Sequence, residues 1–161
     1  GAPGSIEVAK EGGQTAATIV GANVTNMQAR CWQYETAVWL ANPNTAVQLE
    51  ACHIAGTNSD KFLLTESNGQ SYLAGRPLYY TDHCPTLGQP GDLLLFNPSE
   101  YLLGQRGENR TDVSAEVRFD NHEAAFRFVA RLDGMPWWTA QLTPANGTAT
   151  LSPFITLAER A

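Results

Sequence analysis

Hydrophobic and charged residues alternate along residues 126–132. Four apolar side chains occupy every second position, and Arg127 and Arg131 occupy two of the positions between them. Successive side chains of a strand point to opposite faces, so the alternation predicts a half-buried strand with an apolar face and an arginine face. The Asp-Gly pair at 133–134 predicts a turn directly after this strand.

Further strands are predicted in the second half of the chain. The continuous apolar run 93–96 is typical of a strand that is buried on both faces. Residues 97–100 predict a turn into a second run at 101–103, and we expect these two runs to form the centre of the sheet. Residues 113–119 alternate like the strand at 126–132, and residues 151–157 predict the last strand.

The amino-terminal region predicts a hairpin followed by a helix. Residues 6–10 and 16–20 flank a glycine turn at 11–14, as in two short strands of a hairpin. Asn23 or Thr25 can cap the following helix, because both side chains accept hydrogen bonds from the first helical turn. Three residues at helical spacing form its expected buried face: Met27, Cys31 and Tyr34.

The middle of the chain predicts a strand, a second helix and an edge strand. Residues 37–41 form a short apolar strand, and the Asn-Pro pair at 42–43 predicts a helix start. The face of that helix is expected to comprise Val47, Ala51 and Ile54. Residues 71–83 return to strand character, and Pro77 favours an edge position because proline cannot donate to a sheet ladder. The pattern as a whole predicts an α+β fold, a central mixed β-sheet flanked by helices.

Composition and charge favour a folded protein that does not bind nucleic acid by electrostatic attraction. The chain has 161 residues, long enough for one domain with its own core, and 43% of them are hydrophobic. Its net charge of -6 gives no overall attraction to nucleic acid or to an anionic membrane. Its apolar runs are far shorter than the ~20 residues that span a bilayer, so we expect a soluble protein.

Cysteines and histidines are the first candidates for chemistry. Two Cys-His neighbours contain residue types that bind zinc: Cys52-His53 and His83-Cys84. Adjacent strand residues face opposite ways and do not converge easily on one ion, so buried thiols and surface histidines are the simpler interpretation. A thiol nucleophile could be Cys31 or Cys84 with His122 as its base, but no motif brings them together.

Carboxylates and tryptophans are the remaining candidates. Asp112, Glu116 and Asp120 lie on one polar side of the predicted strand, where solvated charge is the ordinary state. Trp137 and Trp138 could stack on a sugar or a base, although packing explains them more simply. We therefore predict no enzyme and no catalytic, metal or cofactor-binding residue.

Several segments resemble, in content and in order, the major capsid proteins of tailed phages with the HK97-type fold. They are residues 8–11, 39–43, 73–77 and 91–94 and the arginine-bearing strand 126–132 with Asp133-Gly134. The resemblance implies that residues 6–125 form an axial-domain-like region and that residues 126–161 form carboxy-terminal strands of the peripheral domain. Residues 1–5 have neither the basic nor the apolar region of a signal peptide, and we expect a cloning scar or a natural loop there. The family's amino-terminal arm, extended loop and long spine helix have no counterpart here.

The resemblance implies a structural subunit that forms hexamers and pentamers of an icosahedral phage head enclosing DNA. Its partners would be copies of itself, together with a scaffold and a maturation protease, with no sequence-specific nucleic acid and no membrane. It would assemble in the bacterial cytoplasm and reside in the virion. The candidate subunit-contact or inter-domain residues are Arg127, Arg131, Trp137 and Trp138. Neither Lys10 nor Lys61 can be assigned to the lysine crosslinks of some family members.

Two other functions remain open from the sequence. An encapsulin-like compartment shell would share the fold but would package an enzyme instead of a genome. A small ligand-binding or hydrolytic domain would use the tryptophan pair or the Cys-His neighbours.

Overall fold

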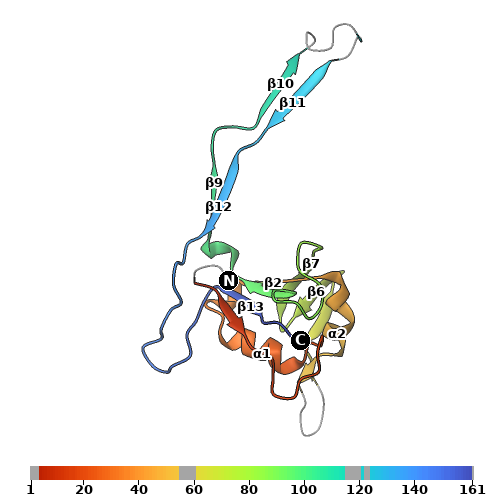
Figure 1. Cartoon of the computed structure of the whole chain (residues 1–161), viewed down its shortest axis with the longest axis vertical. Coiled ribbons are helices and arrows are strands. Elements are labelled where there is room, and N and C mark those ends of the chain that lie inside the picture. Colours follow the sequence, from red (N-terminus) through yellow and green to blue (C-terminus); the bar gives the residue numbers. More distant parts are fainter. Residues whose placement is uncertain (1–3, 55–60, 115–120, 122–123, 161) are drawn as a thin grey trace. The chain divides into compact units, whose positions relative to one another are not determined.

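The computed structural model describes residues 4–54, 61–114, 121 and 124–160 (Figure 1). The chain packs as two compact units. The first unit comprises residues 1–100 and 138–161, and the second comprises residues 101–137. The predicted boundary at 126 does not coincide with either edge of the second unit. The division into an axial-like region and a peripheral-like region stays a prediction.

The first unit is built on a seven-stranded mixed sheet, which confirms the predicted α+β class. Its strands, in spatial order, are β1 (Ile6–Val8), β13 (Phe154–Leu157), β8 (Leu93–Phe96), β2 (Val38–Ala41), β7 (Arg76–Tyr80), β6 (Gln70–Leu73) and β5 (Leu64–Ser67). The pairs β1–β13 and β2–β7 are parallel, and the other four neighbouring pairs are antiparallel. A separate two-stranded sheet joins β3 (His53–Ile54) to β4 (Lys61–Phe62).

Helices accompany this sheet. The α-helices are α1 (Gly21–Ala29) and α2 (Ala46–Ala51), and the 3₁₀ turns are η1 (Tyr34–Thr36), η2 (Pro43–Thr45) and η3 (Pro98–Glu100). Helix α1 lies against β1 and β13. Within the described residues, none of the helices has the length and apolar character that crossing a bilayer requires.

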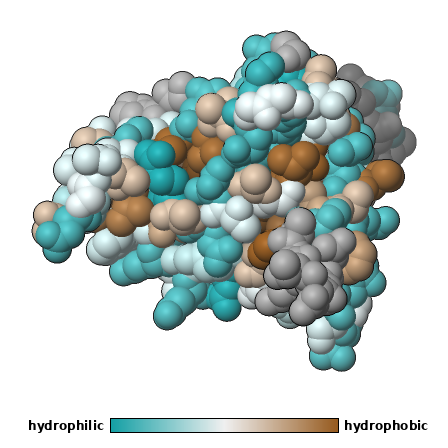
Figure 2. Space-filling view, turned by 90° about the horizontal axis from the view of Figure 1, so that it is seen from below, coloured by the Kyte–Doolittle hydropathy of each residue, from teal (hydrophilic) through white to brown (hydrophobic). Residues whose placement is uncertain are grey.

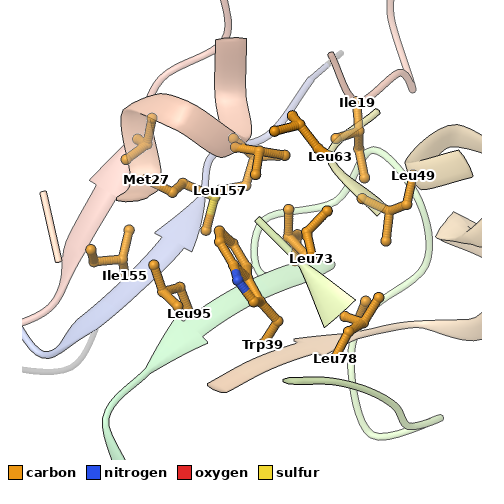
Figure 3. Close-up of a cluster of buried hydrophobic side chains, with 14 of the residues drawn as sticks. Ile19, Met27, Trp39, Leu49, Leu63, Leu73, Leu78, Leu95, Ile155 and Leu157 are labelled. Carbon is orange, nitrogen blue, oxygen red and sulfur yellow. The ribbon is translucent and has the colours of Figure 1, made fainter. Parts of the chain in front are cut away.

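The core of the first unit lies between the sheet and these helices (Figure 3). Trp39 from β2 and Leu95 from β8 are fully buried beside Met27 from α1. Strands β8 and β2 pair with each other at the centre of the sheet, as the apolar run 93–96 predicts. The remaining labelled side chains in Figure 3 come from several other segments: Ile19, Leu49, Leu63, Leu73, Leu78, Ile155 and Leu157.

The predicted amino-terminal hairpin is wrong. Strand β1 pairs in parallel with β13 at the other end of the chain, and residues 16–20 form no strand. Side-chain hydrogen bonds hold this loop instead: the Gln14 amide donates to the Thr18 carbonyl oxygen at 2.8 Å and to Asn23 Oδ1 at 2.8 Å. A polar network therefore takes the place of the expected strand pairing.

The start and end of α1 also differ from expectation. Asn23 and Thr25 both lie inside the helix, and Val20 is the residue at the cap. Asn23 reaches back to accept a hydrogen bond from the Val20 backbone N–H at 3.0 Å. Cys31 and Tyr34 lie beyond the helix end, so only Met27 of the predicted face is part of α1.

The second helix begins where the sequence predicts it. Asn42 Oδ1 accepts a hydrogen bond from the Asn44 backbone N–H at 3.1 Å and so caps the turn that leads into α2. Its predicted buried face is wrong, because Val47 is 74% exposed whereas Leu49 is fully buried. Packing of this short helix onto the core selected the opposite face.

Strand β7 is an interior strand although it contains Pro77. Pro77 pairs with Tyr72 of β6, whereas β2 pairs with β7 only from Leu78 onward. Proline therefore lies outside the ladder with β2, which is why the edge position expected for this segment was wrong. Ala74 and Gly75 form the turn between β6 and β7 with φ values of 49° and 80°.

A buried ion pair holds the end of the chain to the first unit. The Arg160 guanidinium donates to Asp92 Oδ2, and both side chains are completely buried. Arg160 Nε also donates to the Thr18 carbonyl oxygen at 2.6 Å. The sequence contains no pattern that predicts this pair.

The second unit is an antiparallel ribbon of two strand pairs. Strand β9 (Tyr101–Gln105) pairs with β12 (Leu132–Pro136), and β10 (Arg110–Ser114) pairs with β11 (Ala125–Val129). The run 101–103 is thus not part of the central sheet, and residues 133–134 lie within β12 rather than in a turn. Both errors share a cause, since local pattern does not say which strands pair.

Candidate functional site

The apolar face of the ribbon is exposed to solvent. Val113 pairs with Phe126, and Thr111 pairs with Phe128, so these four side chains share one face of β10 and β11. Phe126 is 63% exposed and Phe128 is 75% exposed. The expected half-burial of this strand is therefore wrong for the chain as described. Two adjacent exposed phenylalanines indicate a surface that another element covers.

The opposite face of the ribbon carries a carboxylate between two arginines. Asp112 pairs with Arg127 across the strands. Arg127 Nη2 donates to Asp112 Oδ2 at 2.7 Å, and Arg110 Nε donates to Asp112 Oδ1 at 2.6 Å. These hydrogen bonds, first from Arg127 and then from Arg110, lower the pKa of Asp112 below its usual value. The predicted surface-charge role of Asp112 agrees with this arrangement.

The arginine face is hollowed. A hollow of about 280 Å³ is lined by Arg106, Glu108, Arg110, Arg127, Val129 and Arg131. Arg127, Val129 and Arg131 line one side together, which is the alternation that the sequence predicts. The sequence analysis missed Arg106 and Arg110, because they lie on the other half of the hairpin. The cross-strand register places Arg110 beside Val129, and the Arg106 backbone N–H donates to the Arg131 carbonyl oxygen at 3.0 Å.

Gly134 of β12 lies against the aromatic ring of Tyr101 in β9. A Cβ atom at Gly134 would lie 2.5 Å from the Tyr101 ring, so glycine leaves room for the ring in this position. On both faces of β9 and β12 the surrounding side chains are exposed, Leu103 at 71% and Met135 at 58%. The apolar surface of the second unit is therefore not confined to the phenylalanines.

The two tryptophans have different environments. The Trp138 ring lies 5.9 Å from the Trp32 ring, and its Nε1 donates to Glu100 Oε2 at 2.7 Å. Trp138 thus packs within the first unit, in agreement with the simpler interpretation. Trp137 is 64% exposed, so of the pair it is the one available to a partner.

The thiols of all three cysteines have a raised pKa. Burial raises the pKa of Cys31 to about 12 and that of Cys52 to about 11. Burial and the nearby Asp92 carboxylate also raise the pKa of Cys84. Protonated thiols are poor ligands and nucleophiles. The described residues contain no cluster of three or more His, Cys, Asp or Glu side chains that could hold a metal ion.

Some predicted candidates lie outside the described residues. These are His122, Glu116 and Asp120. The thiol–histidine pair and the three-carboxylate row therefore fall partly outside the described residues and stay predictions.

The face of the molecule shown in Figure 2 offers no comparable apolar surface. Hydrophobic areas there are separated by hydrophilic ones. The ribbon is the candidate functional surface, because phenylalanines are exposed on one of its faces and arginines line the other.

The fold of this chain is similar to that of a solved capsid structure. One similar solved structure is described as "Capsid of empty GTA particle computed with C5 symmetry", with a TM-score of 0.60 and 15% sequence identity. The match covers 96% of this chain and 50% of that chain, so the present chain spans about half the length of its structural relative. The likeness confirms the predicted capsid-like α+β fold. None of the curated proteins compared with the chain matches it.

The sequence itself also matches a protein family. The profile of the phage capsid family covers residues 2–146, which is most of the chain. The family suggested by the order of the short motifs is thereby confirmed. This chain belongs to the phage capsid family.

Proposed function

We propose that this chain is part of a major capsid subunit that forms hexamers and pentamers of an icosahedral phage head. The observation that carries the proposal is the exposed apolar face of the ribbon in a chain of the capsid family. Phe126 and Phe128 gain stability only when another surface covers them, because burying one such side chain is worth about 1.5–3 kcal/mol. Repetition of modest contacts over a symmetric lattice then holds a shell together.

The ribbon supplies the contacts in this proposal. Arg127, Arg131 and Trp137 are exposed on it and serve as contact residues between subunits or between domains. Trp138 supports the first unit from within. Residues 6–125 act as the axial-like region and residues 126–161 as carboxy-terminal strands of the peripheral region. The product resides in the virion after assembly in the bacterial cytoplasm, where a scaffold and a maturation protease assist it.

Electron microscopy of assembled particles tests the proposal. The longest natural polypeptide that contains this chain is produced with its scaffold and protease, and closed shells are the expected product. Phe126→Glu combined with Phe128→Glu should abolish the shells, because charge on this face opposes its burial. The matched control is Val47→Glu, since Val47 is equally exposed but lies on α2 of the first unit. Failure of the unmodified polypeptide to form any shell contradicts the proposal.

A further inference from the structure

Two arginines of the hollow lack a carboxylate partner. Arg110 and Arg127 both bind Asp112, whereas Arg106 and Arg131 have no ion-pair partner among the residues that the structure describes. Glu108 also lines the hollow, so its walls carry four guanidinium groups and one carboxylate. Asp133 lines an adjoining hollow together with Arg106 and Arg131, so this face carries four arginines and three carboxylates and keeps an excess of one positive charge.

The neighbouring contacts show what kind of group this excess charge can bind. Asp112 is held by one hydrogen bond from each of two guanidinium groups, at 2.6 and 2.7 Å. Guanidinium groups match a planar carboxylate in this way because their N–H donors are fixed in one plane. Arg106 and Arg131 offer the same donors on the same face.

A nucleic acid backbone fits this surface less well than a carboxylate does. The chain has a net charge of -6, and Glu108 lines the hollow itself. Proteins that hold phosphates through charge present an unbroken basic patch. Here a polyanion would be repelled both by the net negative charge of the chain and by the Glu108 carboxylate in the hollow. A single protein carboxylate requires only the local pair of guanidinium groups.

The first unit contains more carboxylates than basic groups. Residues 1–100 and 138–161 contain ten Asp or Glu residues but five Lys or Arg residues. Glu50 and Glu66 are exposed, and together with burial they raise the pKa of Tyr80, which lies close to both. No arginine or lysine pairs with either carboxylate among the described residues. The charge of this unit thus complements the arginine hollow.

We propose that Arg106 and Arg131 bind carboxylates on the first unit of a second copy of this chain. The inference rests on the proposed function, because it names the partner of the ribbon's arginine face. Such a contact joins two different surfaces, so each copy can bind a further copy and the contact can repeat around a ring. Complementary charge also orients the approaching copy before apolar surfaces meet.

Zero-length crosslinking of the 161-residue chain tests this contact. The variant R106K/R131K keeps both positive charges and places amines where a carbodiimide can join them to a neighbouring carboxylate. The background is low, because the chain contains only two lysines, Lys10 and Lys61. Mixing ¹⁴N- and ¹⁵N-labelled chains at high concentration makes intermolecular products recognisable by mass spectrometry. We expect mixed-isotope crosslinks from positions 106 and 131 to carboxylates of the first unit, and fewer of them as salt increases.

A charge reversal provides the second measurement. R106E/R131E should weaken self-association, measured by sedimentation, by about tenfold or more, because attraction becomes repulsion. The control K10E/R76E changes the net charge equally but lies in the first unit, and it should have a smaller effect. Crosslinks confined to one chain, no crosslinks, or unchanged association of R106E/R131E would each overturn the inference. Shells that form without these crosslinks would overturn the contact alone, whereas crosslinks without shells would count against the proposed function alone.

Discussion

Each unit of this chain contains a strand with large apolar side chains, but the environments of the two strands are opposite. In the first unit, the apolar strand β8 lies between two neighbouring strands, and Leu95 is fully buried. In the second unit, strand β11 is apolar on one face and has one partner strand, and its Phe128 is 75% exposed. An apolar face therefore shows that a strand is built to be covered. It does not show that the covering element belongs to the same chain.

Breaking the buried ion pair should have the largest effect on the first unit. Arg160→Met leaves the fully buried Asp92 carboxylate without its partner, which typically costs about 3–5 kcal/mol. Chemical denaturation of the chain measures the loss in the free energy of unfolding. The control is the neighbouring exposed residue, Glu159→Gln, which should change stability by less than about 0.5 kcal/mol. An equal effect of the two substitutions would show that the ion pair does not stabilise the first unit.

Truncation of one apolar side chain in each unit tests the comparison directly. Leu95→Ala should lower the free energy of unfolding by about 2–5 kcal/mol, because it leaves a cavity in a closed core. Phe128→Ala removes a larger side chain, but we expect a change of less than about 0.5 kcal/mol, because that side chain is mostly in water. A large loss for Phe128→Ala in the isolated chain would mean that the ribbon has a core of its own.

The glycine beneath Tyr101 tests how the ribbon keeps its own structure. Gly134→Ala places a Cβ 2.5 Å from the Tyr101 ring, so the ring must move, and we expect destabilisation of at most about 0.5–1.5 kcal/mol because Tyr101 is 44% exposed. Amide hydrogen exchange in β9 and β12 measures this loss locally. Gly104→Ala is the matched control, because its Cβ would approach only the Asp133 carbonyl oxygen, at 3.7 Å. Equal protection in the two variants would contradict the packing of Tyr101 on Gly134.

Acid should produce the smallest effect, confined to the arginine face. The pKa of Asp112 is lowered in the folded ribbon, so its ion pairs stabilise the ribbon above the ordinary carboxyl pKa of ~3.9 and are lost as the pH falls through the lowered value. NMR titration of the Asp112 carboxyl measures the shift. Arg127→Gln should move this pKa back toward its ordinary value, because Arg127 contributes most to the shift. An unchanged titration midpoint in that variant would exclude Arg127 as the main cause.

Local signals in the sequence predicted several elements well. The Asn-Pro pair at 42–43 predicted the start of a helix because capping and proline geometry act within a few residues. The apolar run 93–96 predicted a central strand for a similarly local reason, since only a strand covered on both faces tolerates such composition. The alternation at 126–132 likewise placed Arg127 and Arg131 on one side.

Long-range pairing was beyond those signals. Strand β1 pairs with β13 from the far end of the chain, so the local glycine turn suggested the wrong partner. Arg106 lies beside Arg131 because β9 pairs with β12. These two strands are far apart in the sequence, so the local pattern could not predict that Arg106 belongs to the candidate site. The same limitation explains the misplaced run 101–103, whose composition resembles that of a core strand.

The amino-acid sequence by itself determined the α+β class, the capsid family, the two faces of the strand at 126–132 and the absence of any recognisable catalytic motif. These properties follow from side-chain chemistry and from spacing along one segment. Tertiary structure alone decided that Leu95 is buried and Phe128 is not, that Asp92 meets Arg160, and that four arginines surround one hollow. Each of those outcomes depends on which distant segments pair, and the free energy of pairing belongs to both partners rather than to either sequence alone.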